Sequence, residues 1–276
     1  MDLERDLYMA IVGCGQEKAR EIITAHPWLL WDGILRDSLE TPAHYFESLG
    51  GTEALSFMLD IIRQQPAHLQ SDLYKKTFLR GDAMNESVLF RALSNLEHLK
   101  FLVDNADDGV EILNAENYSE QNLAHAAASS STTECLDYIV QHCELGANIL
   151  EARDSEGRTP AFLAVERANR DDFTEALDIL KYILDHSPHG KWELEVRDDD
   201  GNSFAHEAAT GKDTRLLEFL IENCPSGTNI LETINNDGLT PAHMAERFKS
   251  QDCLKFIIDH APHRDETLKL TISTKQ

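Results

Sequence analysis

Four histidines recur along the chain and are the first residues whose chemistry must be explained. His44, His125, His206 and His243 each follow a Thr, Ser or Asn by three residues. Imidazole is the commonest protein ligand for metal ions, and several converging imidazoles would suit zinc. Whether they share one site depends on the elements that carry them.

Cysteine and aspartate residues also suggest metal binding by their type. Cys135, His142 and Cys143 are close in sequence, but positions 135 and 142 would be two helical turns apart, and no fourth ligand is evident. The run Asp198–Gly201 is similar to part of an EF-hand loop, but the first ligand position falls on Val196, which cannot coordinate calcium. We therefore predict no metal site and no cofactor.

Carboxylates are too numerous to mark an acid–base pair by themselves. The chain has 49 Asp and Glu residues against 25 Lys and Arg, a formal net charge of −24. The sequence contains no Gly-rich phosphate loop, nucleophile elbow or zinc-protease helix. We predict no catalytic residues, no small-molecule substrate and no enzymatic activity.

The negative charge also restricts the class of partner. It repels the phosphates of nucleic acids and anionic membrane surfaces, and it attracts basic proteins. The alternative is that the charge only keeps a long chain in solution. The acidic start, the lack of an apolar span and five scattered cysteines predict a cytoplasmic location.

A short string that would start a helix recurs along the chain. Thr41–His44, Thr159–Phe162 and Thr240–His243 read Thr-Pro-Ala followed by His or Phe. Thr, Ser or Asn before an apolar stretch is a typical N-cap, and Pro suits the first helical turn. Less complete copies start at Ser87, Asn122 and Ser203, and a seventh near Arg5 is recognised only by its place.

A second helix is predicted downstream of each start. An apolar i, i+3, i+4 stripe recurs at intervals of 36, 44, 37, 44, 37 and 37 residues. The stripes are Ala19/Ile22/Ile23, Leu55/Met58/Leu59, Leu99/Leu102/Val103, Leu136/Ile139/Val140, Leu180/Ile183/Leu184, Leu217/Leu220/Ile221 and Leu254/Ile257/Ile258.

The segments between these helix pairs also share a pattern. Residues 148–157, 192–201 and 229–238 each end in an acidic or amide residue and Gly, two residues before the next helix cap. Such endings are typical of tight turns with a positive φ. Each unit is therefore predicted as two helices followed by a loop with a turn.

These residues resemble the ankyrin repeat family. Gly157-Arg158-Thr159-Pro160 and Gly238-Leu239-Thr240-Pro241-Ala242-His243 match its Gly-x-Thr-Pro-x-His run. The resemblance implies an all-α repeat solenoid of about seven stacked helix-turn-helix units joined by hairpin-like loops. It covers residues 1–262, with atypical repeats over 1–110, clear repeats over 111–262 and a C-terminal tail over 263–276.

The repeat resemblance implies a structural role for the four histidines. Repeats stacked at helix-packing distance would hold them about 10 Å apart, which is too far for shared coordination. The family pattern implies that each imidazole forms hydrogen bonds across the turn and the helix start. The cysteines fall at equivalent positions of different repeats, where they would serve as small hydrophobic residues.

Departures from the repeat pattern mark places where loops are expected. The unit starting at Thr159 has about seven extra residues near 168–175, and the unit starting at Thr41 has a longer loop near 66–83. Trp28, Trp31 and Trp192 lie at loops or loop–helix junctions, where we expect them to pack between repeats; the alternative is that they anchor a partner.

Ankyrin-like stacking implies a concave surface that binds another protein through its loop tips and first helices. The acidic tips with interspersed arginines favour a basic partner, and we expect a monomer. The predicted partner-binding residues are Asn117, Tyr118, Glu120, Arg153, Asp154, Glu156, Arg158, Arg167, Arg197, Asp198, Asp199, Asp200, Asn202, Asn236, Asp237, Arg247 and Phe248.

Two other functions remain compatible with the sequence. The atypical N-terminal units could contain an unrecognised enzymatic or effector activity, as in bacterial proteins delivered into a host cytosol. The chain could also be a structural module of a larger assembly.

Overall fold

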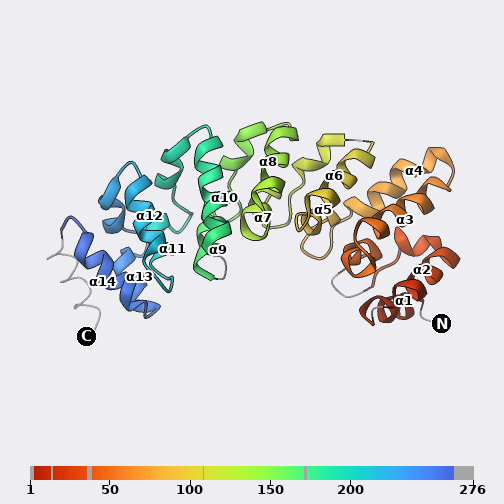
Figure 1. Cartoon of the computed structure of the whole chain (residues 1–276), viewed down its shortest axis with the longest axis horizontal. Helices are drawn as coiled ribbons and strands as arrows, with labels where there is room; N and C mark the ends of the chain where they lie inside the picture. Colours follow the sequence, from red (N-terminus) through yellow and green to blue (C-terminus); the bar gives the residue numbers. More distant parts are fainter. Residues whose placement is uncertain (1–2, 14, 36–38, 108, 171–172, 264–276) are drawn as a thin grey trace. The chain divides into compact units, whose positions relative to one another are not determined.

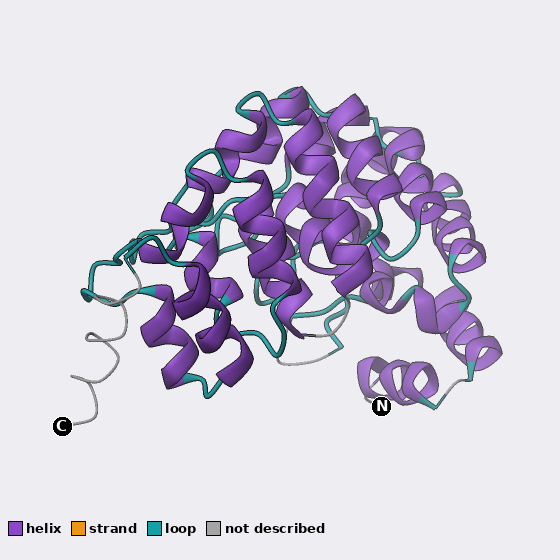
Figure 2. Cartoon of the chain, turned by 60° about the vertical axis from the view of Figure 1, so that its left-hand side comes forward, coloured by secondary structure: helices purple, strands orange, loops and turns teal. Residues whose placement is uncertain are grey.

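The computed structural model describes residues 3–13, 15–35, 39–107, 109–170 and 173–263. Within these ranges the regular structure is helical, and loops connect the helices (Figure 2). Two isolated antiparallel bridges, Glu116–Asn122 and Arg197–Ser203, occur in the loops. No helix in these ranges combines the length and the apolar character needed to cross a membrane.

The chain divides into two compact units, Met1–Leu123 with Gln141–Glu144 and Ala124–Val140 with Leu145–Gln276. In the first unit α1 packs on α2, α3 packs on α4 and α6, and α5 packs on α6. Its elements are α1 (Leu3–Val12), α2 (Gln16–Ala25), η1 (Pro27–Leu30), η2 (Pro42–Tyr45), η3 (Glu47–Leu49), α3 (Thr52–Arg63), α4 (Ala67–Tyr74), η4 (Lys75–Leu79), α5 (Val88–Ala92), α6 (Leu96–Asn105) and η5 (Gly109–Asn114).

The second unit shows the repeat most regularly. Figure 1 shows α9–α10, α11–α12 and α13–α14 as successive helix pairs, and α11 packs on both α9 and α13. The elements that begin at the boundary or follow it are α7 (Leu123–Ser130), α8 (Thr133–His142), η6 (Gly146–Glu151), α9 (Pro160–Arg170), α10 (Phe173–His186), η7 (Gly190–Glu195), α11 (Phe204–Ala208), α12 (Arg215–Asn223), η8 (Gly227–Glu232), α13 (Pro241–Arg247) and α14 (Gln251–His260).

The predicted helix-pair repeat is confirmed. Six of the predicted starts, from Thr41 to Thr240, are each followed at once by a helix, and α1 contains the seventh at Arg5. The predicted apolar stripes lie on α2, α3, α6, α8, α10, α12 and α14, and supply buried core residues in each. Four cysteines, Cys135, Cys143, Cys224 and Cys253, are buried as free thiols, as expected of small core residues.

Two details of the first unit differ from the prediction. The first helix after Thr41 is not an α-helix but two short 3-10 helices, η2 and η3, which end at Gly50 with φ of 110°. The segment 66–83 is not a simple loop, because it contains α4 and the π-helical turn η4. Leu73, Tyr74 and Phe78 are buried there, so packing of these apolar residues explains the added helix.

The extra residues expected in a loop near 168–175 mainly lengthen helices instead. α9 continues to Arg170 and α10 begins at Phe173, and residues 171–172 lie outside the described residues. Ala176, Ile179 and Leu180 of α10 are buried, so the longer helix has an apolar face to pack. The predicted C-terminal tail lies outside the described residues beyond His263.

The recurrent histidines join each helix start to the following turn. The backbone N–H of Ser203 donates to His206 Nδ1 at 3.1 Å, the Ser203 hydroxyl lies 2.9 Å from the same atom, and His206 Nε2 contacts the Leu239 carbonyl at 2.9 Å. His44 makes the same contacts with Thr41 and the Glu86 carbonyl. The predicted structural role is confirmed for these residues.

Burial adds an electrostatic consequence to this cap. Desolvation lowers the pKa of His44, His125 and His206, although a hydrogen bond to a backbone carbonyl opposes the shift in each case. A neutral ring matches the geometry, because Nδ1 accepts from a backbone N–H while Nε2 faces a carbonyl.

Candidate protein-binding edge

The turns between repeats are each organised by one Asp or Asn side chain. Asp154 Oδ1 accepts hydrogen bonds from the backbone N–H groups of Glu156 at 3.0 Å and Arg158 at 2.9 Å. Asn235 Oδ1 accepts from Asp237 and Leu239 in the same register. This pattern is an Asx turn, in which a short polar side chain replaces a backbone acceptor. The first residue of each turn is therefore needed to shape it.

Hydrogen bonds between backbones connect neighbouring turns in the second unit. The Asp199 N–H donates to the Glu156 carbonyl at 3.0 Å, and the Asn236 N–H donates to the Asp200 carbonyl at 2.9 Å. The Asn236 side-chain amide adds a bond to the Asp199 carbonyl at 2.8 Å. We call residues 153–158, 197–202 and 234–239 the turn edge.

Two arginines reinforce the turn edge from repeat to repeat. Arg153 Nη1 donates to the carbonyls of Gly157 and Arg197, both at 2.9 Å. Arg197 Nη1 repeats this arrangement one turn further on, at 3.4 Å from the Gly201 carbonyl and 2.8 Å from the Ile234 carbonyl. These guanidinium groups brace the backbone and place positive charge among the acidic tips.

Burial separates the acidic side chains of the turn edge into two groups. Asp154 is 4% exposed and pairs with Arg158, whose Nη2 lies 2.8 Å from Asp154 Oδ2. Asp198 is half-buried and holds Asn202 through backbone and side-chain bonds of 2.7 and 2.9 Å. In contrast, the exposed carboxylate residues of the turn edge are Glu156, Asp199, Asp200 and Asp237.

The predicted tip residues Asn117, Tyr118 and Glu120 belong to the first unit. Asn117 is 7% exposed, and its Oδ1 accepts from the N–H groups of Ser119 and Gln121. Tyr118 is 71% exposed, while its N–H donates to the Met84 carbonyl at 2.9 Å. Asn117 therefore shapes its turn, and Tyr118 and Glu120 are the solvent-facing members.

The predicted residues on the first helices have different environments. The Arg167 guanidinium donates to the Ser131 carbonyl and to Glu175 Oε2, both at 2.7 Å, and so ties two repeats together. Arg247 and Phe248 lie at the end of α13 and are exposed. Only these last two offer free side-chain surface.

Exposed aromatic side chains correct one expectation from the sequence. Trp192 lies in η7 and is 65% exposed, and Trp28 in η1 is 41% exposed, so neither is packed fully between repeats. Trp192 occupies the position of Asn148 in η6 and Asn229 in η8, which are also exposed. Aligning the three loops by sequence would therefore have predicted that the Trp192 side chain is exposed.

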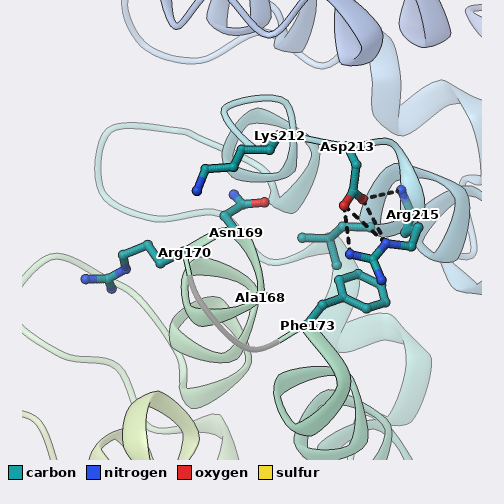
Figure 3. Close-up of a pocket in the computed structure, with 8 residues that line it drawn as sticks. Ala168, Asn169, Arg170, Phe173, Lys212, Asp213 and Arg215 are labelled. Carbon is teal, nitrogen blue, oxygen red and sulfur yellow. Dashed lines mark hydrogen bonds and ion pairs between the residues drawn. The ribbon is translucent and has the colours of Figure 1, made fainter.

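A cavity of about 220 Å³ lies where α9 ends near the connection between α11 and α12 (Figure 3). Figure 3 shows Arg215 held by Asp213, with a shortest contact of 2.7 Å, and the Arg215 guanidinium lies 3.9 Å from the centre of the Phe173 ring. The Arg215 hydrogen bonds lower the pKa of Asp213. Asn169 donates to the Glu207 carbonyl at 2.7 Å. Asp213 and Arg215 are thus paired with each other and Asn169 is bonded to the next repeat, as in a joint between repeats.

Comparison with known proteins agrees with this geometry. Residues 172–267 match the family described as ankyrin repeats (3 copies). The chain therefore carries ankyrin repeats over this stretch, and the resemblance inferred from the sequence is confirmed there. Repeats of this kind form protein-binding modules and are usually non-catalytic. None of the curated proteins compared with the chain matches it.

Proposed function

We propose that this chain is a non-catalytic scaffold or adaptor whose turn edge binds a basic protein segment. The observation that supports this most directly is the exposure of Glu156, Asp199, Asp200 and Asp237 on turns that are hydrogen-bonded to one another. A braced backbone holds these carboxylates without a large loss of entropy on binding. Mechanistically, the protein would hold, block or recruit its partner by occupancy.

The proposed contact set is smaller than the full set of tip residues. Asp154 and Asp198 use their carboxylates to build the turns, so their loss would damage the edge rather than test it. Exposed Arg247 and Phe248 add one cationic and one aromatic group at the end of α13. Aromatic and arginine side chains are frequent anchors in interfaces.

The charge supports a partner that is protein rather than nucleic acid or membrane. At −24 the chain would steer basic partners toward it and repel phosphate-rich surfaces. We further propose that it acts as a monomer in the cytoplasm, where a reducing environment suits buried free thiols such as Cys135 and Cys224.

The test removes the four exposed carboxylates without touching the turn-forming residues. The variant combines Glu156→Gln, Asp199→Asn, Asp200→Asn and Asp237→Asn. At about 0.5 kcal/mol for each exposed charge pair, the four changes cost about 2 kcal/mol, or roughly a 30-fold loss of affinity. Partners captured from cytosolic lysate are identified first, and the affinity of a purified partner is then measured by fluorescence anisotropy at low and physiological salt.

A matched variant controls for total charge. It neutralises four exposed acids on the second helices instead, and circular dichroism confirms that both variants fold. The control changes are Asp178→Asn, Asp185→Asn, Glu222→Gln and Asp252→Asn. Selective weakening by the turn-edge variant, greater at low salt, supports the proposal. Equal binding by both variants and the natural protein refutes it.

A further inference from the structure

One buried glutamate breaks the pattern of the 3-10 helices that precede the turns. The helices η5, η6, η7 and η8 each begin with Gly, and the fourth residue is Ile112, Ile149, Glu193 and Ile230 in turn. All three isoleucines are buried, and Glu193 is also only 1% exposed. A carboxylate in an apolar position is unfavourable unless a partner compensates for its lost hydration.

The hydrogen bonds within the protein do not fully provide that compensation. The nearby Thr159 hydroxyl interacts with the Glu193 carboxylate, but neither Thr159 Oγ1 nor Glu193 Oε1 has a hydrogen bond of acceptable geometry. The repeats that start at Ser87 and Thr159 carry Phe90 and Phe162 where four other repeats have the capping histidine, so neither cap hydroxyl has an imidazole to pair with. The state of the Thr159 hydroxyl is explained by the missing histidine, whereas the buried Glu193 Oε1 points to a missing ligand.

Two further ligand atoms lie beside Glu193. One ligand atom each from Glu151, His189 and Glu193 lie within 4.8 Å of one another. His189 Nδ1 is 2.5 Å from Glu151 Oε1, which also accepts from Ser187 Oγ at 2.8 Å and the His189 N–H at 2.7 Å. Tetrahedral zinc with ligand bonds of about 2 Å needs its ligand atoms about 3.3 Å apart, a separation that lies between the 2.5 Å of the His189–Glu151 contact and the 4.8 Å limit of the cluster.

The repeats themselves show what is special about this cluster. Glu232 and His263 form the same carboxylate–imidazole contact further along the chain, with Nδ1 and Oε2 2.8 Å apart. Among the residues that the structure describes, only the cluster at Glu151 gathers a third potential ligand. The pair is therefore a repeat feature, whereas the triad depends on Glu193.

We propose that Glu151, His189 and Glu193 bind a divalent transition metal of the zinc class. Two carboxylates and one imidazole suit zinc better than calcium or magnesium, which prefer six or more oxygen ligands. The His189 side chain is 67% exposed, which leaves an entry path and an open fourth position for water or a partner's side chain. The ion would join η6 to η7 and so connect two successive repeats. The inference is independent of which partner the turn edge binds.

The experiment is a calorimetric titration of the full chain with Zn²⁺ after treatment with a chelator, with Co²⁺ absorption as a check on ligand geometry. The variants Glu193→Ile, which restores the residue of the other repeats, and His189→Ser, which matches Ser226, remove one ligand each. Each variant is expected to weaken one Zn²⁺ site at least tenfold. Glu193→Gln is a second variant in case the isoleucine disturbs folding.

The control is Glu232→Gln, which breaks the equivalent pair that lacks the third ligand. It is expected to leave the Zn²⁺ affinity and stoichiometry unchanged. The proposal is overturned if the natural protein does not bind Zn²⁺, if the ligand variants bind it as tightly, or if Glu232→Gln loses the same site. Melting curves with and without Zn²⁺ should show stabilisation of the natural protein that Glu193→Ile lacks.

Discussion

Replacing His206 with alanine tests the most repeated structural device of this fold. The change removes the imidazole that connects the start of α11 with the following turn. His206 Nδ1 accepts a hydrogen bond from the Ser203 N–H and contacts the Ser203 hydroxyl. His206 Nε2 contacts the Leu239 carbonyl. Because His206 is 0% exposed, water would not easily replace these contacts.

The expected loss follows from these contacts. Three hydrogen bonds at about 1 kcal/mol each give about 3 kcal/mol, and the unpaired Ser203 N–H, unpaired Leu239 carbonyl and small cavity raise the total to about 3–5 kcal/mol. The Ser203 hydroxyl keeps its contact with Thr233 Oγ1 at 2.7 Å, which limits the loss. With a denaturant slope of about 2–3 kcal/mol/M, the urea midpoint of the second unit should fall by roughly 1–2 M.

The assay is urea unfolding followed by far-ultraviolet circular dichroism. His186→Ala is the matched control, because His186 is an exposed histidine of α10 in the same unit, and its removal should cost under about 1 kcal/mol. A midpoint for His206→Ala within error of that control would refute the idea that the capping imidazole stabilises the repeat.

Two further predictions concern the caps and the turns. Because burial lowers the pKa of the three capping histidines, they contribute stability that is present above the unfolded pKa of about 6.5 and is lost as pH falls below it. Between pH 7 and 5, His206→Ala should lose stability less steeply than the natural protein, by up to about 1.4 kcal/mol per pH unit; parallel urea-midpoint profiles would contradict this. Gly157→Ala should cost about 2–4 kcal/mol, because φ is +73° and the new Cβ would lie 2.2 Å from Asp199 Oδ1. Gly227→Ala, at φ of +57° with open space around it, should cost about 1–2 kcal/mol, and equal urea midpoints for the two variants would contradict the steric explanation.

The periodic pattern of apolar residues predicted the helix pairs well, because helix formation depends mainly on residues that are close in sequence. An N-cap before an apolar helix and a stripe at i, i+3 and i+4 each depend on residues within two helical turns. The segment after Arg63 was predicted less well, because whether it coils or forms α4 depends on burial of Leu73, Tyr74 and Phe78. Their burial depends on tertiary contacts, and a local sequence pattern does not include such contacts.

For the candidate binding residues, too, the sequence predicted the residue types on the turns but not the environment of each side chain. The sequence placed acidic residues on the turns, but it did not distinguish Asp154, which is buried against Arg158, from Glu156, which is exposed to solvent while its Oε2 lies 3.1 Å from Arg158 Nη1. Likewise, it predicted Arg167 as surface, whereas the Ser131 carbonyl and Glu175 hold its guanidinium. Whether these residues contact a partner remains a prediction.

The sequence by itself determined the repeat, the helix caps and the acidic character of this protein, because these follow from residue type and near-neighbour spacing. Only the tertiary structure decided which charges are free and which are used within the fold. It also decided that Glu151, His189 and Glu193 meet, although the first lies 38 residues before the second. Stacking brings equivalent positions of successive repeats together, so contacts about one repeat apart depend on packing that no local motif records.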